Sequence, residues 1–266
     1  KFGKLRDYGK QVGADFVATG HYARIVAAAD GTLRVAKGRD ARKDQSYVLS
    51  GLRRELLPHV LFPVGDYPKD QIRGIAEREG LPVHNKPDSQ EICFVPDDDY
   101  LGFVREMRPN RSTEGTLVDE NGQVLREHDG IEAFTIGQRR GLGIAVGEPR
   151  YVVQIEPLTK TVTIGAKTRL ERAGLEAERF NWQGLAPTGV ARCWARIRAQ
   201  HQPVPATVEA LPDERARVLF DAPQKAVAPG QLVTVYQDDL VWGGGWIDRA
   251  LDAEDPSART AELSSK

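Results

Sequence analysis

A cysteine at the edge of a polar stretch is the side chain in this sequence that is best suited to covalent chemistry. Cys93 lies in the run Pro-Asp-Ser-Gln-Glu-Ile-Cys-Phe (87–94) and is one of two cysteines in 266 residues. A thiol with a pKa near ~8.5 is only a few per cent thiolate at neutral pH, so covalent chemistry needs a cationic or dipolar neighbour. Lys86 and His84 are close in sequence, whereas the two carboxylates of the run oppose the thiolate. By itself the stretch favours a small buried side chain over a nucleophile.

The second cysteine, Cys193, belongs to an alternating segment from Val190 to Ala199. Small apolar side chains occupy one set of positions, and alternation with a period of two predicts a strand with one buried face. Cys193 is therefore expected to be a core thiol. The opposite face suits phosphate contact and base stacking, or is simply a solvated surface. It carries Arg192, Trp194, Arg196 and Arg198.

Three further segments place polar groups where a ligand can reach them. Gly20-His21 follows the short apolar run 15–19, and a glycine at the carboxyl end of a buried strand is typical of ligand sites in open α/β sheets. Residues 39–47 hold three basic side chains that can contact phosphates or only solvent. The segment Gly-Gln-Arg-Arg-Gly-Leu-Gly (137–143) can cradle a nucleic-acid backbone or form a flexible hairpin tip.

Composition indicates a globular protein of two or three domains. The chain has 40% apolar and 28% charged residues and a formal net charge of -1, which argues against a polycationic nucleic-acid binder but allows local basic patches. Two distant cysteines argue against a disulfide scaffold and for a reducing compartment. We find no apolar run of the ~18 residues that a membrane helix needs and no signal-peptide pattern.

The elements that must position these groups differ along the chain. Helices are predicted over 1–12, ending at Gly13, and over 69–79, with Asp66 as the available cap. Asn121-Gly122 is expected to form the tight turn of a hairpin. From about residue 170, short strands at regular spacing with Pro and Gly between them predict a small barrel or sandwich.

With these segments in place, the chain resembles the bacterial and mitochondrial tRNA-specific 2-thiouridylases, the MnmA type. Each matching piece is weak alone, but six in this order over nearly the whole chain are specific. The pieces are Ala18-Thr19-Gly20-His21-Tyr22, Lys43-Asp44-Gln45-Ser46-Tyr47, Leu61-Phe62-Pro63-Val64-Gly65, Asp88-Ser89-Gln90-Glu91-Ile92-Cys93-Phe94, Gly137-Gln138-Arg139-Arg140-Gly141-Leu142-Gly143 and Pro229-Gly230-Gln231.

The resemblance implies an α/β fold class: a partial adenine-nucleotide α-hydrolase-like, Rossmann-like domain, then a small central domain and an all-β carboxyl-terminal barrel. We expect these domains at 1–95, 96–168 and 169–250, with a flexible tail at 251–266. The implied reaction is ATP-dependent 2-thiolation of the wobble uridine of tRNA. ATP adenylates the uracil 2-oxygen, a cysteine persulfide attacks the activated carbon, and a second cysteine resolves the intermediate by forming a disulfide.

Site residues follow from the resemblance position by position. Cys93 matches the persulfide-bearing cysteine, and Gly20 matches a glycine that contacts ATP. The implied cofactor is ATP with Mg, with no stably bound metal. The implied partners are tRNA and a sulfur-relay protein or cysteine desulfurase, with no membrane, in the cytoplasm. The residues that match tRNA contacts are His21, Lys43, Asp44, Gln45, Arg198 and Gln231.

The sequence also departs from the family pattern. Ala199 stands where the family often has an aromatic residue, and Trp194 is an unproven substitute. The Ser-Gly-Gly-x-Asp-Ser phosphate loop and the upstream cysteine are absent, and the only methionine is Met107. We therefore expect a fragment or processed form that is inactive alone. Two other hypotheses stay open: a non-enzymatic RNA-binding module, and another ATP-dependent adenylating enzyme of the same superfamily.

Overall fold

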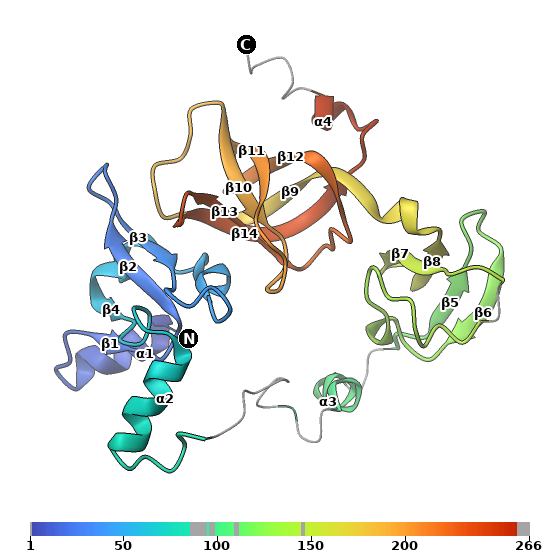
Figure 1. The fold of residues 1–266 in the computed structure, drawn as a ribbon. Coiled ribbons are helices and arrows are strands. Elements are labelled where there is room, and N and C mark those ends of the chain that lie inside the picture. The colour runs from blue at the N-terminus through green and yellow to red at the C-terminus, as the bar shows by residue number, and fades with distance from the viewer. Residues whose placement is uncertain (1, 86–94, 96–98, 109–111, 145–146, 260–266) are drawn as a thin grey trace. The chain divides into compact units, whose positions relative to one another are not determined.

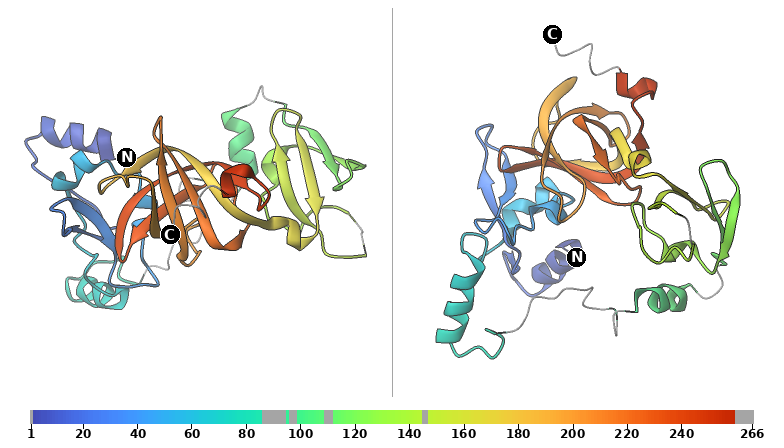
Figure 2. Two further views of the ribbon diagram at one scale, coloured as in Figure 1. Left: turned by 90° about the horizontal axis from the view of Figure 1, so that it is seen from above. Right: turned by 45° about the vertical axis from the view of Figure 1, so that its right-hand side comes forward.

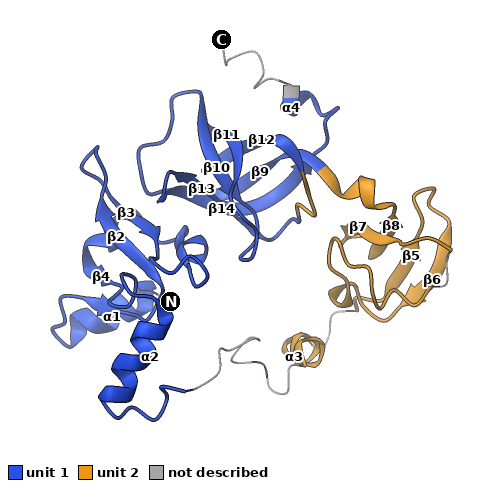
Figure 3. Ribbon diagram, viewed as in Figure 1, with its two compact units in different colours: residues 1–85, 172–223, 228–266 blue, residues 86–171, 224–227 orange. Residues whose placement is uncertain are grey.

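The computed structural model describes residues 2–85, 95, 99–108, 112–144 and 147–259 (Figure 1). The chain divides into two compact units, which Figure 3 colours separately. The first unit combines residues 1–85, 172–223 and 228–266, and the second contains 86–171 and 224–227. Cys93, the predicted persulfide carrier, lies outside the described residues.

The amino-terminal part of the first unit has the helix–strand order that the sequence predicts. α1 (Phe2–Gln11) is followed by Gly13 at a φ of 76°, a left-handed conformation that suits glycine at a helix end. β1 (Val17–Ala18) pairs in parallel with β4 (Val60–Leu61). β1 is shorter than the predicted run 15–19, and the expectation of a buried strand there was wrong, because Val17 is buried whereas Phe16 is 53% exposed.

The second helix, α2 (Lys69–Arg78), corrects one expectation about capping. Asp66 does not cap it; the carboxylate of Asp66 instead faces Arg24 at 3.8 Å and Arg39 at 3.6 Å. The Lys69 amide donates to Asp40 Oδ2 over 3.1 Å, so a carboxylate from a distant loop caps the helix. This hydrogen bond lowers the pKa of Asp40.

The second half of the first unit is a β-barrel (Figure 2). Six of the described strands close it, in the order β13-β10-β11-β12-β9-β14, with β14 pairing back to β13. Neighbouring strands such as β10 and β11 run antiparallel. α4 (Pro256–Arg259) follows the barrel, inside the segment 251–266 that was expected to be a flexible tail. The strands are β9 (Glu171–Trp182), β10 (Val190–Arg196), β11 (Val204–Leu211), β12 (Arg215–Lys225), β13 (Leu232–Gln237) and β14 (Leu240–Leu251).

A hairpin from the amino-terminal part extends the barrel sheet. β2 (Ala23–Ala27) pairs with β3 (Leu33–Lys37), and Ala36 of β3 pairs with Leu240 of β14. The eight-stranded sheet therefore contains two strands that precede the barrel by more than a hundred residues. The sequence did not predict this connection, because pairing between distant strands leaves no local pattern.

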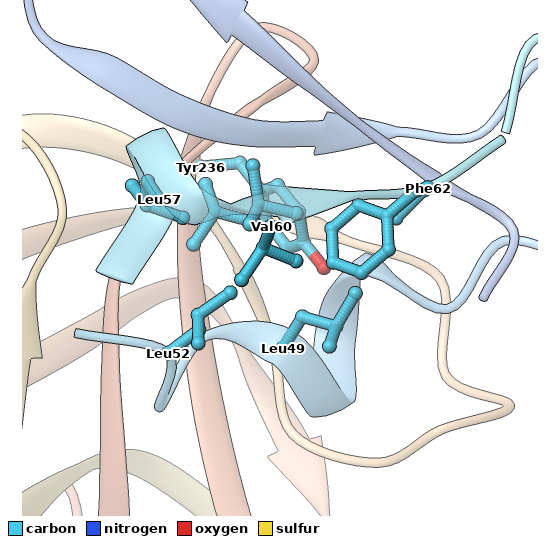
Figure 4. Close-up of a cluster of buried hydrophobic side chains, with 9 residues drawn as sticks. Leu49, Leu52, Leu57, Val60, Phe62 and Tyr236 are labelled. Carbon is cyan, nitrogen blue, oxygen red and sulfur yellow. The ribbon is translucent and has the colours of Figure 1, made fainter. Parts of the chain in front are cut away.

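A shared core joins the hairpin, two short 3₁₀ helices and the barrel. Tyr236 of β13 is fully buried among apolar side chains of η1 (Ser46–Leu49), η2 (Arg54–His59) and β4 (Figure 4). Gln183 is also fully buried, and its amide is satisfied on both sides. It accepts from the Val35 amide at 2.9 Å and donates to the Leu49 carbonyl at 3.0 Å and to the Leu52 carbonyl at 3.1 Å.

The second unit is a small four-stranded sheet of order β6-β5-β8-β7 with a short helix. Asp99 caps that helix through the Gly102 amide at 2.8 Å, and Asn121-Gly122 forms the predicted turn, with Gly122 at a φ of 80°. Among the described residues, no helix is long and apolar enough to cross a membrane. The elements are α3 (Tyr100–Met107), β5 (Gly115–Val118), β6 (Val124–His128), η4 (Ile131–Ala133), β7 (Tyr151–Glu156), β8 (Thr161–Gly165) and η5 (Lys167–Leu170).

Candidate functional site

The turn after β1 brings Gly20 and His21 to the surface of the amino-terminal part. The Thr19 amide donates to the Leu61 carbonyl at 3.0 Å, which continues the pairing of β1 with β4. Thr19 Oγ1 lies 2.8 Å from His21 Nδ1 and fixes the imidazole. No described atom lies within 4 Å of a Cβ placed on Gly20, so the fold itself does not demand glycine here. The open backbone fits a ligand that approaches closely.

Residues 38–45 form a loop that leads into η1 and is organised by the carboxylate of Asp44. Its Oδ1 accepts from the amides of Gly38 and Ser46, both at 3.1 Å, and its Oδ2 accepts from Ser46 Oγ at 3.0 Å. The next residue, Gln45, accepts from the Tyr22 amide at 2.9 Å and so ties the loop to the residue after His21. The Lys43 amide donates to the Asp40 carbonyl at 3.0 Å.

Arg196 completes the set of donors around Asp44. Its Nη1 lies 2.9 Å from Asp44 Oδ2, and the two side chains are only 12% and 6% exposed. The same guanidinium donates to the carbonyls of Arg198 and Ala199. Its central carbon lies 5.4 Å from the ring centre of Tyr47. Arg196 is thus a buried brace between the loop and the barrel and is not free to contact phosphate.

A second arginine of the same strand is also engaged by a carboxylate. Arg192 forms a two-pronged pair with Asp221, at 2.8 and 2.6 Å, which lowers the pKa of Asp221. Trp194 is 46% exposed and lines a separate hollow of 360 Å³ beside Arg192. Arg198, in contrast, forms no ion pair with any described residue. Of the three arginines that the sequence places around Trp194, only Arg198 therefore has no ion pair with a described residue.

Cys193 is the core thiol that the alternation predicts. It is 6% exposed, and burial raises its pKa to about 12. A thiol with such a pKa is not a nucleophile at neutral pH, because it is almost entirely protonated.

Arg198 and Gln231 line one hollow of 740 Å³ in the first unit. His21 lines a second hollow of 750 Å³. Leu232 and Trp246 line both, so the two hollows adjoin along this pair. Leu232 and Trp246 are cross-strand partners of β13 and β14. Three residues that the sequence analysis assigned to tRNA contact thus border one continuous surface; their roles stay predictions.

Trp246 is the residue that sequence reasoning missed. It is 42% exposed and is the first exposed side chain after five buried positions of β14. A signal was present in the run Gly-Gly-Gly-Trp (243–246), because glycine inside a strand often marks a bulge or a place where a ligand or another backbone approaches closely. Trp194 drew attention instead, since its neighbours are arginines.

The glycine–arginine segment of the second unit is an ordered loop and not a loose hairpin tip. The Gly137 amide donates to the Val152 carbonyl at 2.8 Å, and Gln138 exchanges hydrogen bonds with Thr135. Arg139 lines a hollow of 460 Å³ together with the loop glycines. Arg139 and Arg140 are both exposed, and neither forms an ion pair with any described residue.

Three family models match the chain in sequence order. Residues 1–97 match a model described as a tRNA methyl transferase HUP domain. Residues 102–166 match a tRNA methyl transferase PRC-barrel domain, and residues 172–247 match an aminomethyltransferase beta-barrel domain. These matches confirm the predicted fold class, a Rossmann-like domain followed by a central domain and a β-barrel. They define a class of three-domain proteins, and the descriptions of the first two domain models name a tRNA methyl transferase.

Similar proteins narrow this class to one family. The chain is 44% identical over 254 residues to a tRNA-specific 2-thiouridylase MnmA of Geotalea uraniireducens, covering 96% of this chain and 68% of the relative. Proteins of the same name from Rhodopirellula baltica and Syntrophotalea carbinolica are 45% and 46% identical, over 95% and 93% of this chain and 64% and 70% of theirs. The chain belongs to the MnmA family, which confirms the resemblance and makes it a member of an enzyme family.

Proposed function

We propose that this chain acts in the ATP-dependent 2-thiolation of the wobble uridine of tRNA. The observation that carries the proposal is the surface formed by the two adjoining hollows, which His21, Arg198 and Gln231 border. Its support is the membership of a family whose named relatives are tRNA-specific 2-thiouridylases. The whole activity is proposed for the full protein, since the chain spans 64–70% of the length of the relatives named above.

The tRNA is held by local cations and not by a global positive charge. The net charge is -1, so attraction depends on individual unpaired guanidinium groups such as that of Arg198. Asp44 serves as a positioning residue, because its carboxylate is engaged by four donors within the protein. Lys43 and Gln45 flank it, and the loop sets where they meet the RNA.

Cys93 carries the sulfur that is transferred. The terminal sulfur of its persulfide forms a bond to C2 of the uracil as the activated 2-oxygen leaves. A second thiolate then attacks Sγ of Cys93, breaks the bond between the two sulfurs and leaves the transferred sulfur on C2. The protein is oxidised to a disulfide in this step, and an external thiol must reduce it. Cys193 is unsuited as that second thiol because it is buried and its pKa is about 12.

ATP and a sulfur donor complete the reaction. ATP, when bound with Mg, supplies the adenylyl group that makes the uracil 2-oxygen a leaving group. The backbone at Gly20, open at the end of β1, fits a close approach by such a nucleotide. A cysteine desulfurase or a sulfur-relay protein loads Cys93 in the cytoplasm, where a reducing environment keeps the thiol free.

The test is the 2-thiouridine content of tRNA in a strain that depends on this gene. We expect Cys93→Ser to abolish 2-thiouridine, as measured by mass spectrometry of tRNA nucleosides, while tRNA binding stays within about twofold because one sulfur atom carries little of the binding energy. The matched control is Cys193→Ala, which removes a buried thiol and leaves 2-thiouridine in place. Normal 2-thiouridine in the Cys93→Ser strain contradicts the proposal.

A further inference from the structure

Trp246 follows three glycines at which the backbone of β14 lies close to its neighbours. A Cβ on Gly245 would lie 2.7 Å from the Glu178 carbonyl oxygen, and one on Gly244 would lie 2.5 Å from Ser50 Oγ. The pairing of β14 with β9 also shifts register between Gly244 and Trp246. Such irregularities bend a strand and re-aim the next side chain. The indole is consequently carried by a closely packed strand and is still 42% exposed.

The surroundings of the indole are polar and cationic. The guanidinium of Arg179, which is paired with Glu178 at 3.0 Å, lies 5.9 Å from the centre of the ring. Arg198 and Gln231 line the same hollow as the indole, and Ala199 adds only a methyl group to that wall. The hollow of 740 Å³ lies within the ~300–1,000 Å³ range of small-ligand sites. An aromatic face, a cation and an amide around one hollow are the groups that recognise a nucleotide.

We propose that Trp246 is the platform on which one unpaired base of the bound RNA stacks. Arg198 contacts the phosphate beside that base, and the Gln231 amide faces its polar edge. Every base has a π-face, so the contact adds affinity without selecting a sequence. This assignment rests on the proposed function, because it requires that tRNA is the ligand of this surface.

Trp194 provides a matched comparison within the same chain. It is exposed to a similar extent, 46% against 42%. Its hollow is half as large, at 360 Å³, and the arginine in that hollow is held by Asp221. The surface around Trp194 therefore lacks the unpaired cation that the surface around Trp246 has.

The test is tRNA binding by this chain and its variants over a series of salt concentrations. We expect Trp246→Ala to weaken binding about five- to a hundredfold, the loss typical of one stacked base, with no change in the salt dependence. Trp246→Phe keeps an aromatic face and retains most of the affinity. Arg198→Ala weakens binding and lowers the slope of log affinity against log salt by about 0.7–0.9, the value for one phosphate contact.

Tryptophan fluorescence gives a second readout that does not depend on the alanine variant folding. Stacking quenches the indole, so we expect tRNA to quench Trp194→Phe as it quenches the unmodified chain, and to quench Trp246→Phe much less. Unchanged affinity in Trp246→Ala, or undiminished quenching in Trp246→Phe, overturns the stacking role while tRNA binding stands. Absence of saturable tRNA binding by the unmodified chain overturns the proposed function, and the stacking role with it.

Discussion

Asp44 Oδ2 lies 2.9 Å from Arg196 Nη1, in a buried ion pair that joins the loop 38–45 to strand β10 of the barrel. Both residues were expected to face outward, Asp44 toward tRNA and Arg196 toward phosphate or solvent. Their pairing instead fixes the loop that carries Lys43 and Gln45 against the strand that leads to Arg198. The ion pair between Asp44 and Arg196 thus holds two groups of predicted tRNA-contact residues together, one on the loop and one after β10.

Breaking this pair is expected to destabilise the protein strongly. Asp44→Asn keeps the size of the side chain but leaves the Arg196 charge buried without a counter-ion, which costs about 3–5 kcal/mol of the free energy of unfolding. Denaturant unfolding measures the change. The control is Asp221→Asn, which removes the partner of the largely exposed Arg192 and costs under about 1 kcal/mol. Equal losses in the two variants contradict a structural role for the buried pair.

The close approach between β14 and Ser50, the residue that follows η1, predicts a second stability effect. A methyl group on Gly244 would lie 2.5–2.7 Å from Ser50 side-chain atoms and the Val233 carbonyl oxygen. Gly244→Ala is therefore expected to lower the unfolding free energy by about 1–3 kcal/mol through overpacking. Gly74→Ala in α2, where the nearest atom is 3.9 Å away, is expected to raise it by up to about 1 kcal/mol. An unchanged unfolding free energy in Gly244→Ala would contradict the predicted overpacking.

Cys193 predicts a loss of stability at alkaline pH. Burial raises its pKa in the folded protein from 9.0 to about 12. The contribution of the raised Cys193 pKa to the unfolding free energy is complete below pH 9. It is lost as the pH rises toward 12, because the thiol of the unfolded chain releases its proton first. The unfolding free energy should fall by about 1.4 kcal/mol per pH unit for this group in that window. Cys193→Ala should flatten this slope by the same amount, and an unchanged slope contradicts the shift.

The same burial predicts how Cys193 reacts. In a Cys93→Ser variant, where Cys193 is the remaining thiol, a thiol-alkylating reagent at pH 8 should modify the native protein far more slowly than the denatured protein. Peptide mass spectrometry after a timed exposure measures the modified fraction. Rapid modification of the native variant contradicts both the burial and the raised pKa.

The loop of the second unit predicts a change in the salt dependence of tRNA binding. Arg139 and Arg140 are exposed cations on an ordered loop, so each can neutralise one phosphate. The double variant with alanine at both positions should bind tRNA more weakly, and its slope of log affinity against log salt should fall by about 1–2. The control is Arg192→Ala, whose guanidinium is already paired with Asp221 and should leave the slope unchanged. Equal slopes in the double variant and in Arg192→Ala would contradict a role of this loop in binding RNA.

Local patterns predicted what depends on neighbouring residues. Alternation of side chains identified the core position of Cys193, and Asn121-Gly122 identified a turn. The predicted cap of α2 was wrong. Asp66 was chosen because it is near in sequence, whereas the actual cap, Asp40, lies 29 residues from the Lys69 amide that it accepts from. Pairing of residues 44 and 196, separated by 152 positions, has no local signal at all.

The surface shared by the two hollows likewise combines residues that sequence motifs predicted with residues that only the fold brings together. The family motifs named His21, Arg198 and Gln231, which lie in separate segments of sequence. Only the register of β13 against β14 brings Leu232 opposite Trp246 and makes that pair the common wall of both hollows. Trp194 attracted the stacking hypothesis because arginines flank it in sequence, yet those arginines are occupied by Asp44 and Asp221.

The central claim is that Cys93 carries the sulfur that enters tRNA. The most direct measurement loads the full protein with radiolabelled sulfur from a cysteine desulfurase and cysteine, and then follows the label after addition of ATP and tRNA. We predict label on the peptide that contains Cys93 and its transfer to tRNA in a single turnover, with neither event in Cys93→Ser. Label that reaches tRNA from the Cys93→Ser protein would contradict the account.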